Sequence, residues 1–209
     1  MISAREALER LREGNHRFVS EAGHRDTLTG RARRDEVAAG QKPVAIVLGC
    51  SDSRVPTEIV FDQGLGDLFV IRVAGNIAAP SQVASVEFAA ERLGTRLVVV
   101  LGHSECGAVL ATLEELGRPS ESRSQNLGSI VDRIRPSVEP LLARESEDDP
   151  DTLVRKAVRA NIRVAADHLR HGSEVLEQSI RKDGLLVVGA EYSLKTGVVD
   201  FFDGVPEAG

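Results

Sequence analysis

Four short apolar runs constrain the fold of this chain more than any other feature of its sequence. They are PVAIVLG at 43–49, LFVIRV at 68–73, RLVVVLG at 96–102 and GLLVVGA at 184–190. Each is apolar on nearly consecutive positions and rich in β-branched residues, which is typical of strands covered on both faces. The runs therefore predict the strands of a parallel sheet.

The segments between the runs carry helical patterns. SQVASVEFAAERLG at 81–94 has an apolar side and ends in a glycine, and residues 126–171 are helical by pattern. We expect Pro136 and Pro140 to break that second segment into pieces. Alternation of strands with helices predicts an α/β fold, with a central, mostly parallel β-sheet flanked by helices.

The first forty residues differ from the rest. SAREALERLREGNHRFV at 3–19 predicts an amphipathic helix, with Ser3 as N-cap and Glu6 three residues later, and a polar stretch follows to about Gly40. We expect residues 1–40 to form an N-terminal helical arm and residues 41–209 to form the α/β catalytic domain. No linker or repeat divides the chain, so the whole is one domain.

Charge and hydropathy limit the partners. The 209 residues carry a formal net charge of -6, which argues against a nucleic-acid surface. The start of the chain lacks the apolar core of a secretory signal, and no run approaches the roughly 18 apolar residues of a membrane helix. We therefore expect a cytoplasmic protein with no membrane partner.

Both cysteines of the chain stand just after apolar runs. Cys50 follows the first run directly, while His103 and Cys106 follow the third in an H-x-x-C spacing. Because functional groups gather at the carboxyl ends of parallel strands, the two loops are expected to meet. Two thiolates and an imidazole suit Zn²⁺ and leave a fourth position for water or substrate. Bound zinc lowers the pKa of water to about 7, which makes hydroxide available as a nucleophile.

Asp52 and Arg54 complete a C-x-D-x-R pattern around Cys50. A carboxylate so close to zinc either occupies the fourth position or is held away from it, and the fork of an arginine can hold it in bidentate fashion. Each motif alone has an ordinary explanation, because buried cysteine acts as a small hydrophobe and Asp-Ser-Arg after a strand forms capped turns. The two together favour a metal site.

In this combination the chain resembles the β-class carbonic anhydrases. LREGNHRFV at 11–19, GDLFVIRVAGN at 66–76 and GLLVVGAEYSLKTGVVDFF at 184–202 resemble further elements of that family, in order. The resemblance implies reversible hydration of carbon dioxide to bicarbonate and a proton by a zinc-bound hydroxide. It implies Cys50, His103 and Cys106 as zinc ligands, and Asp52 with Arg54 as the catalytic pair, Asp52 ligating zinc only in a closed form.

The resemblance also implies a substrate side. Gln41 matches a glutamine that binds bicarbonate across a dimer interface, Gly107 a residue whose backbone amide positions substrate, and Phe69 and Phe88 positions that line an apolar pocket for carbon dioxide. The family forms intertwined homodimers or higher homo-oligomers in which the N-terminal helices pack on a partner.

One position departs from part of the family. Members with a regulatory bicarbonate site commonly carry a tryptophan where this chain has Val47, and the chain has no tryptophan. Together with Gln41, this favours the open form with water on zinc.

Three alternatives stay open. The same ligands could hydrolyse carbonyl sulfide or carbon disulfide. The site could be a non-catalytic zinc module, although Asp52 and Arg54 argue against one. Cys50 and His103 could also form a cysteine hydrolase, which leaves Cys106 unexplained.

Overall fold

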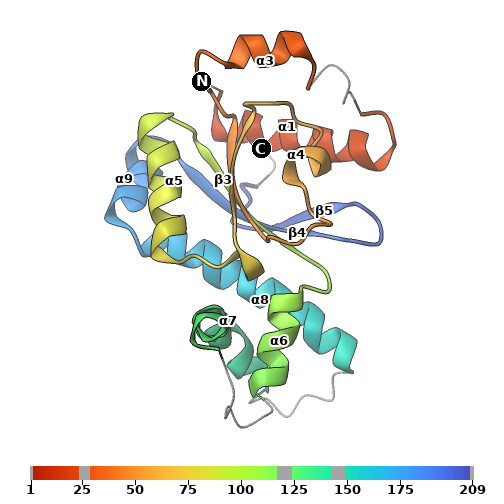
Figure 1. Ribbon diagram of the computed structural model, residues 1–209. Coiled ribbons are helices and arrows are strands. Elements are labelled where there is room, and N and C mark those ends of the chain that lie inside the picture. Colours follow the sequence, from red (N-terminus) through yellow and green to blue (C-terminus); the bar gives the residue numbers. More distant parts are fainter. Residues whose placement is uncertain (1, 24–28, 117–123, 143–148, 208–209) are drawn as a thin grey trace.

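The four apolar runs become four neighbouring strands of one sheet. The computed structural model describes residues 2–23, 29–116, 124–142 and 149–207. Its elements, drawn in Figure 1, are α1 (Ala4–Val19), α3 (Arg31–Val37), β1 (Ala45–Gly49), α4 (Thr57–Val60), β2 (Leu68–Arg72), the 3-10 turn η1 (Ala74–Asn76), α5 (Pro80–Arg92), β3 (Leu97–His103), α6 (Gly107–Leu116), α7 (Gln125–Leu142), α8 (Pro150–His171), α9 (Glu174–Lys182), β4 (Leu186–Tyr192) and β5 (Val199–Asp203).

The sheet has the order β2-β1-β3-β4-β5. The first four strands are parallel, and β5 runs antiparallel to β4. Every residue of β1 and β3 is buried, as expected for strands covered on both faces. The mostly parallel sheet predicted from the sequence is confirmed.

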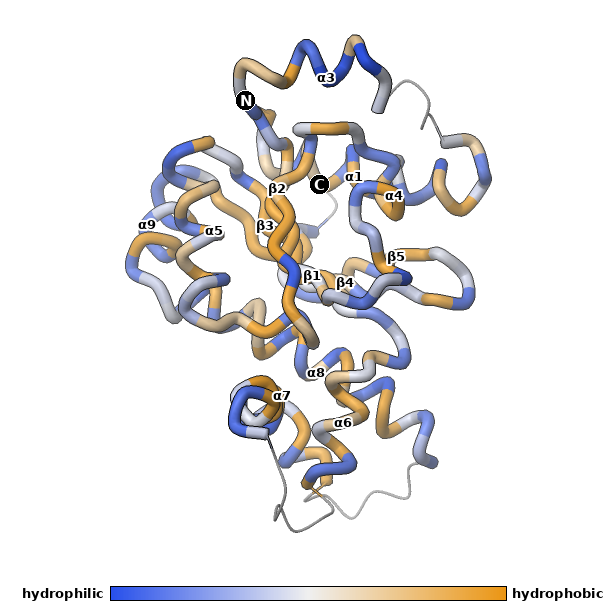
Figure 2. Tube along the Cα trace, viewed as in Figure 1, coloured by the Kyte–Doolittle hydropathy of each residue, from blue (hydrophilic) through white to orange (hydrophobic). Residues whose placement is uncertain are grey.

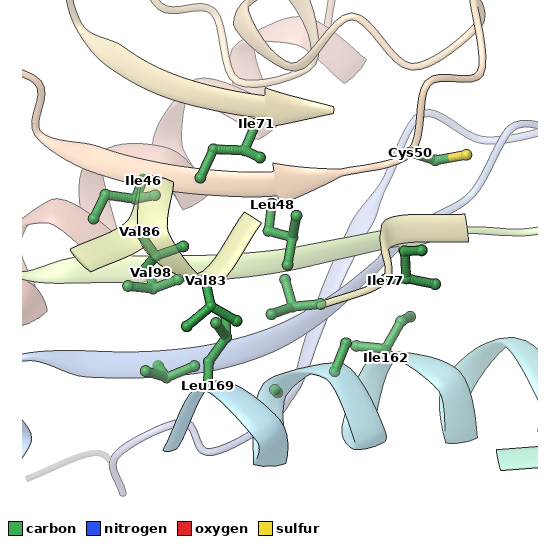
Figure 3. Close-up of a cluster of buried hydrophobic side chains, with 14 of the residues drawn as sticks. Ile46, Leu48, Cys50, Ile71, Ile77, Val83, Val86, Val98, Ile162 and Leu169 are labelled. Carbon is green, nitrogen blue, oxygen red and sulfur yellow. The ribbon is translucent and has the colours of Figure 1, made fainter. Parts of the chain in front are cut away.

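Helices cover both faces of the sheet. On one face, strand residues such as Ile46 and Leu48 join Val86 of α5 and Ile162 of α8 in an apolar cluster (Figure 3). On the other face, α1 and α4 cover a second cluster. Figure 2 shows the consequence: the trace is most hydrophobic along the central strands.

The N-terminal arm packs on its own chain through α1. Ser3 and Glu6 form the expected capping box, and Ala7, Leu8 and Leu11 are buried in the second apolar cluster. Helix α3 buries no residue. That this arm also contacts a partner subunit stays a prediction.

Helix α7 contradicts one expectation, because it runs through both Pro136 and Pro140 without a break. A proline removes one helical hydrogen bond and leaves the carbonyl four residues earlier without its donor. Both prolines lie on the exposed side of α7. On that side water can hydrogen-bond to backbone groups that the prolines leave unpaired, while the opposite side of α7 is held by buried residues including Ile134 and Val138.

Candidate metal centre

Three potential ligands meet where β1 and β3 end. Cys50 directly follows β1, His103 is the last residue of β3, and Cys106 directly precedes α6. Because β1 and β3 are parallel and paired in register, their carboxyl ends lie side by side. The three ligand atoms all lie within 4.8 Å of one another, and all three residues are buried.

The ring of His103 is held in the orientation that a metal ligand needs. Its Nδ1 lies 2.9 Å from the backbone oxygen of Ser104. A carbonyl only accepts, so Nδ1 carries the proton and the lone pair is on Nε2. That Nε2 is buried and has no hydrogen-bond partner among the described residues. A buried nitrogen with an unused lone pair fits a bound cation.

The two thiols share one environment. The hydrogen bond with the Cys106 thiol, aided by His103 and the backbone N–H of Gly75, lowers the pKa of Cys50 to about 4. The neighbouring Cys50 sulfur, together with burial, raises the pKa of the Cys106 thiol. The two sulfurs thus lie beside His103 at a place where a metal cation can replace a thiol proton. This donor set fits zinc.

Asp52 and Arg54 form a bidentate pair beside the three ligands. Arg54 Nε lies 3.0 Å from Asp52 Oδ1, and Nη2 lies 2.8 Å from Oδ2. The Arg54 guanidinium holds the pKa of the Asp52 carboxyl well below its usual range. Oδ2 is also 3.8 Å from His103 Nε2, so the carboxylate stands next to the atom that faces a metal.

Arg72 matches the arginine of the family's regulatory bicarbonate site by resemblance, but its hydrogen bonds to the loop of Cys50 and Asp52 were not predicted from the sequence. Its Nε donates to the backbone oxygen of Cys50, and its Nη2 donates to the backbone oxygen of Asp52. The arginine thereby fixes the loop that carries both side chains. A charged residue inside the apolar run LFVIRV is the signal that could have indicated this role.

Gly107 is placed next to the ligands, as the first residue of α6 directly after Cys106. A Cβ added to Gly107 meets no atom within 4 Å, so the backbone here borders open space. This position is compatible with an amide that contacts substrate.

The other expected substrate residues lie elsewhere in the chain. Gln41 is exposed and precedes β1, at the amino edge of the sheet. Phe69 and Phe88 pack on each other with ring centroids 6.1 Å apart. Phe69 pairs in register with Ile46, four residues before Cys50, which is about 13 Å along the strand. A single chain does not bring these three residues to the metal centre.

Fold and site together define an α/β metalloenzyme with a Cys₂His zinc centre. The sequence model of the family described as carbonic anhydrase matches residues 45–199. The chain therefore belongs to the β-class carbonic anhydrases, which are zinc lyases that hydrate carbon dioxide. The family, the enzyme class and the zinc cofactor expected from the sequence are confirmed.

Several relatives support the same assignment. Carbonic anhydrase 2 of Mycobacterium tuberculosis is 37% identical over 191 residues, covering 91% of this chain and 89% of the relative. A carbonic anhydrase of Mycolicibacterium smegmatis is 37% identical over 194 residues, covering 93% and 91%. The crystal structure of the β-carbonic anhydrase CafA of Aspergillus fumigatus superposes with a TM-score of 0.73 at 28% identity, covering 82% of this chain and 81% of that one.

Proposed function

We propose that the chain hydrates carbon dioxide at the Cys50, His103 and Cys106 centre, with Asp52 and Arg54 as its catalytic pair. The observation that carries the proposal is the buried, unpartnered Nε2 of His103, which faces two thiols and stands 3.8 Å from the Asp52 carboxylate. A zinc ion held by these three ligands supplies the acidification of water that makes hydroxide available near neutral pH.

Asp52 acts as the acceptor that orients the attacking water. Both of its carboxylate oxygens accept from Arg54, and each carboxylate oxygen has more than one acceptor site, so a further hydrogen bond fits. Arg54 keeps the carboxylate ionised and turned toward itself, and this restraint favours the open form in which Asp52 leaves the fourth ligand position to water. A closed form requires the carboxylate to leave Arg54.

The substrate side is completed by a second copy of the chain. Gln41, Phe69 and Phe88 lie away from the metal centre of their own chain, so their expected roles with bicarbonate and carbon dioxide require a partner. A homodimer, or a higher homo-oligomer built from it, is the assembly that we propose.

The cytoplasm is the compartment that we propose. In the described residues, no helix has the length and apolar character needed to cross a membrane. Both Cys50 and Cys106 are free thiols, and metal binding requires them to stay reduced, which a reducing compartment favours.

Stopped-flow hydration of carbon dioxide, followed with a pH indicator, tests the proposal on zinc-loaded protein. We expect a rate well above buffer that falls at least about 100-fold in Asp52→Asn with zinc content unchanged. Asp167→Asn, on the exposed side of α8, is the matched control and should keep full activity.

A loaded wild-type protein without hydration activity contradicts the proposed reaction. Sulfide release from carbonyl sulfide or carbon disulfide in the same sample then identifies the alternative substrate, and its absence leaves a non-catalytic zinc module. Stoichiometric zinc excludes a cysteine hydrolase.

A further inference from the structure

The sulfur of Cys50 has a hydrogen-bond donor from outside its own loop. The backbone N–H of Gly75, in the turn η1 after β2, donates to Cys50 Sγ at 3.4 Å. Gly75 has a φ of 73°, in the left-handed region that favours glycine. A Cβ added there would lie 2.7 Å from Ile134 Cδ1. This turn is therefore built so closely that only glycine fits.

A side chain from a distant helix holds the same glycine. Asn161 Nδ2 of α8 donates to the backbone oxygen of Gly75 at 2.8 Å, across 86 positions of the sequence. The two hydrogen bonds together fix the position of Gly75, because one uses its N–H and the other its C=O. Figure 3 shows Cys50 beyond the end of β1 and Ile162, the neighbour of Asn161, on α8.

Asn161 is an unusual residue for its position. It is 2% exposed and lies on a face of α8 whose other buried members are apolar, Ala157, Val158, Ile162 and Ala165 among them. A buried amide costs free energy unless it is hydrogen-bonded, and asparagine is a poor helix former. Its described bond is the one to Gly75, so the position of this turn is what the asparagine secures.

We propose that Asn161 is a positioning residue of the metal centre: it holds Gly75 so that the Gly75 N–H stays bonded to the sulfur of Cys50. This inference rests on the metal centre proposed above, because Cys50 is one of its ligands. A hydrogen bond to a thiolate withdraws charge from the sulfur and fixes its direction. Outer-shell contacts of this kind tune both metal affinity and the electronics of the bound metal.

The experiment compares metal binding in Asn161→Leu and wild type. Leucine has a similar volume and no donor. Competition with a zinc-binding indicator should show about 10-fold or greater loss of Zn²⁺ affinity. In the Co²⁺-loaded protein, the sulfur-to-cobalt charge-transfer band should move to longer wavelength, because a sulfur without its hydrogen bond gives up charge more readily.

Thr95→Val is the matched control. Thr95 is also buried and also donates from its side chain to a distant backbone oxygen, that of Pro43, but at the amino edge of the sheet. The change should lower the melting temperature without moving the cobalt band or the zinc affinity. Asn161→Ala, which favours the helix, serves as a second variant where leucine does not fit.

The possible results distinguish the positioning role of Asn161 from the existence of the metal centre. A cobalt band at the wild-type wavelength in both Asn161 variants, whatever their stability, overturns the positioning role. A wild-type protein that binds neither Zn²⁺ nor Co²⁺ overturns the metal centre itself.

Discussion

At the scale of single residues, the metal ligands are the least replaceable side chains of the chain. Cys106→Ser exchanges a thiol that can lose its proton to a bound metal for a hydroxyl that does not, and leaves two ligands. Loss of an outer-shell contact typically lowers metal affinity by about 10- to 100-fold. Because Cys106 is itself a ligand, we expect Cys106→Ser to lower zinc affinity by more than that. Metal analysis after dialysis checks this.

Thr112→Val is the control for that measurement. Thr112 is fully buried in α6, the helix that starts after Cys106, and bonds only within its own helix in the described contacts. Its replacement should leave zinc content unchanged. One zinc per chain retained by Cys106→Ser after dialysis would contradict the ligand assignment.

The ligands could be predicted from the sequence, while the residues that support them could not. Cys50, His103 and Cys106 follow strands that the apolar runs mark clearly, and parallel strands bring their carboxyl ends together. Asn161 reaches Gly75, and through Gly75 the sulfur of Cys50, only because α8 packs across the sheet at one register. Such docking depends on the whole core, and no local pattern of residues encodes it.

At the scale of elements, the Gly-Asn-x-Arg-Phe segment of α1 connects three elements through the side-chain hydrogen bonds of Asn15. Asn15 is 6% exposed, and its Nδ2 donates to the backbone oxygens of Val60 at 3.1 Å and Gly197 at 2.8 Å. Its Oδ1 accepts from the backbone N–H of Val199 at 2.9 Å. One side chain therefore ties α1 to the end of α4 and to the start of β5.

Replacing Asn15 should loosen all three elements. Asn15→Ala leaves buried backbone groups without partners, at a cost of about 3 kcal/mol in the free energy of unfolding. The melting temperature should fall by roughly 6–12 °C. His16→Ala, the exposed neighbour, should stay close to wild type in the same thermal scan. Equal melting temperatures for the two variants would show that the hydrogen bonds of Asn15 do not stabilise the contact of α1 with α4 and β5.

Elements were predictable to the extent that burial determines them. The four parallel strands begin and end within about two residues of the apolar runs, because such runs of β-branched residues favour extended strands. The continuous path of α7 could not be predicted, because the effect of Pro136 and Pro140 depends on which side of the helix faces water. Helix α3 was missed for a related reason, as it buries no residue and has no apolar periodicity.

At the scale of the whole molecule, the metal centre and Gln41 lie at opposite ends of strand β1. Cys50 follows the last residue of β1, and Gln41 precedes its first. The strand between them is fully buried and extended, so Gln41 lies far from the metal centre of its own chain. The two residues are nine positions apart, and their separation could be predicted from the sequence, because the apolar run between them indicates an extended strand.

A dimer purified from two differently tagged chains tests whether Gln41 acts across the interface. One chain carries Asp52→Asn and the other Gln41→Ala, and each alone should hydrate carbon dioxide poorly. If Gln41 serves the partner's centre, the mixed dimer has one intact site, made of Asp52 from one chain and Gln41 from the other. Stopped-flow hydration should then reach about half of the wild-type rate, because one of two sites has every group that the mechanism needs.

The reciprocal pairing reverses that expectation. When one chain carries both substitutions and its partner is wild type, action across the interface leaves no intact site, since the only working Asp52 then faces an alanine at position 41. Action within one chain instead leaves the wild-type chain fully active. A mixed dimer that is inactive in the first pairing and half-active in the second would assign Gln41 to its own chain, and a protein that sediments as a monomer would contradict the shared site altogether.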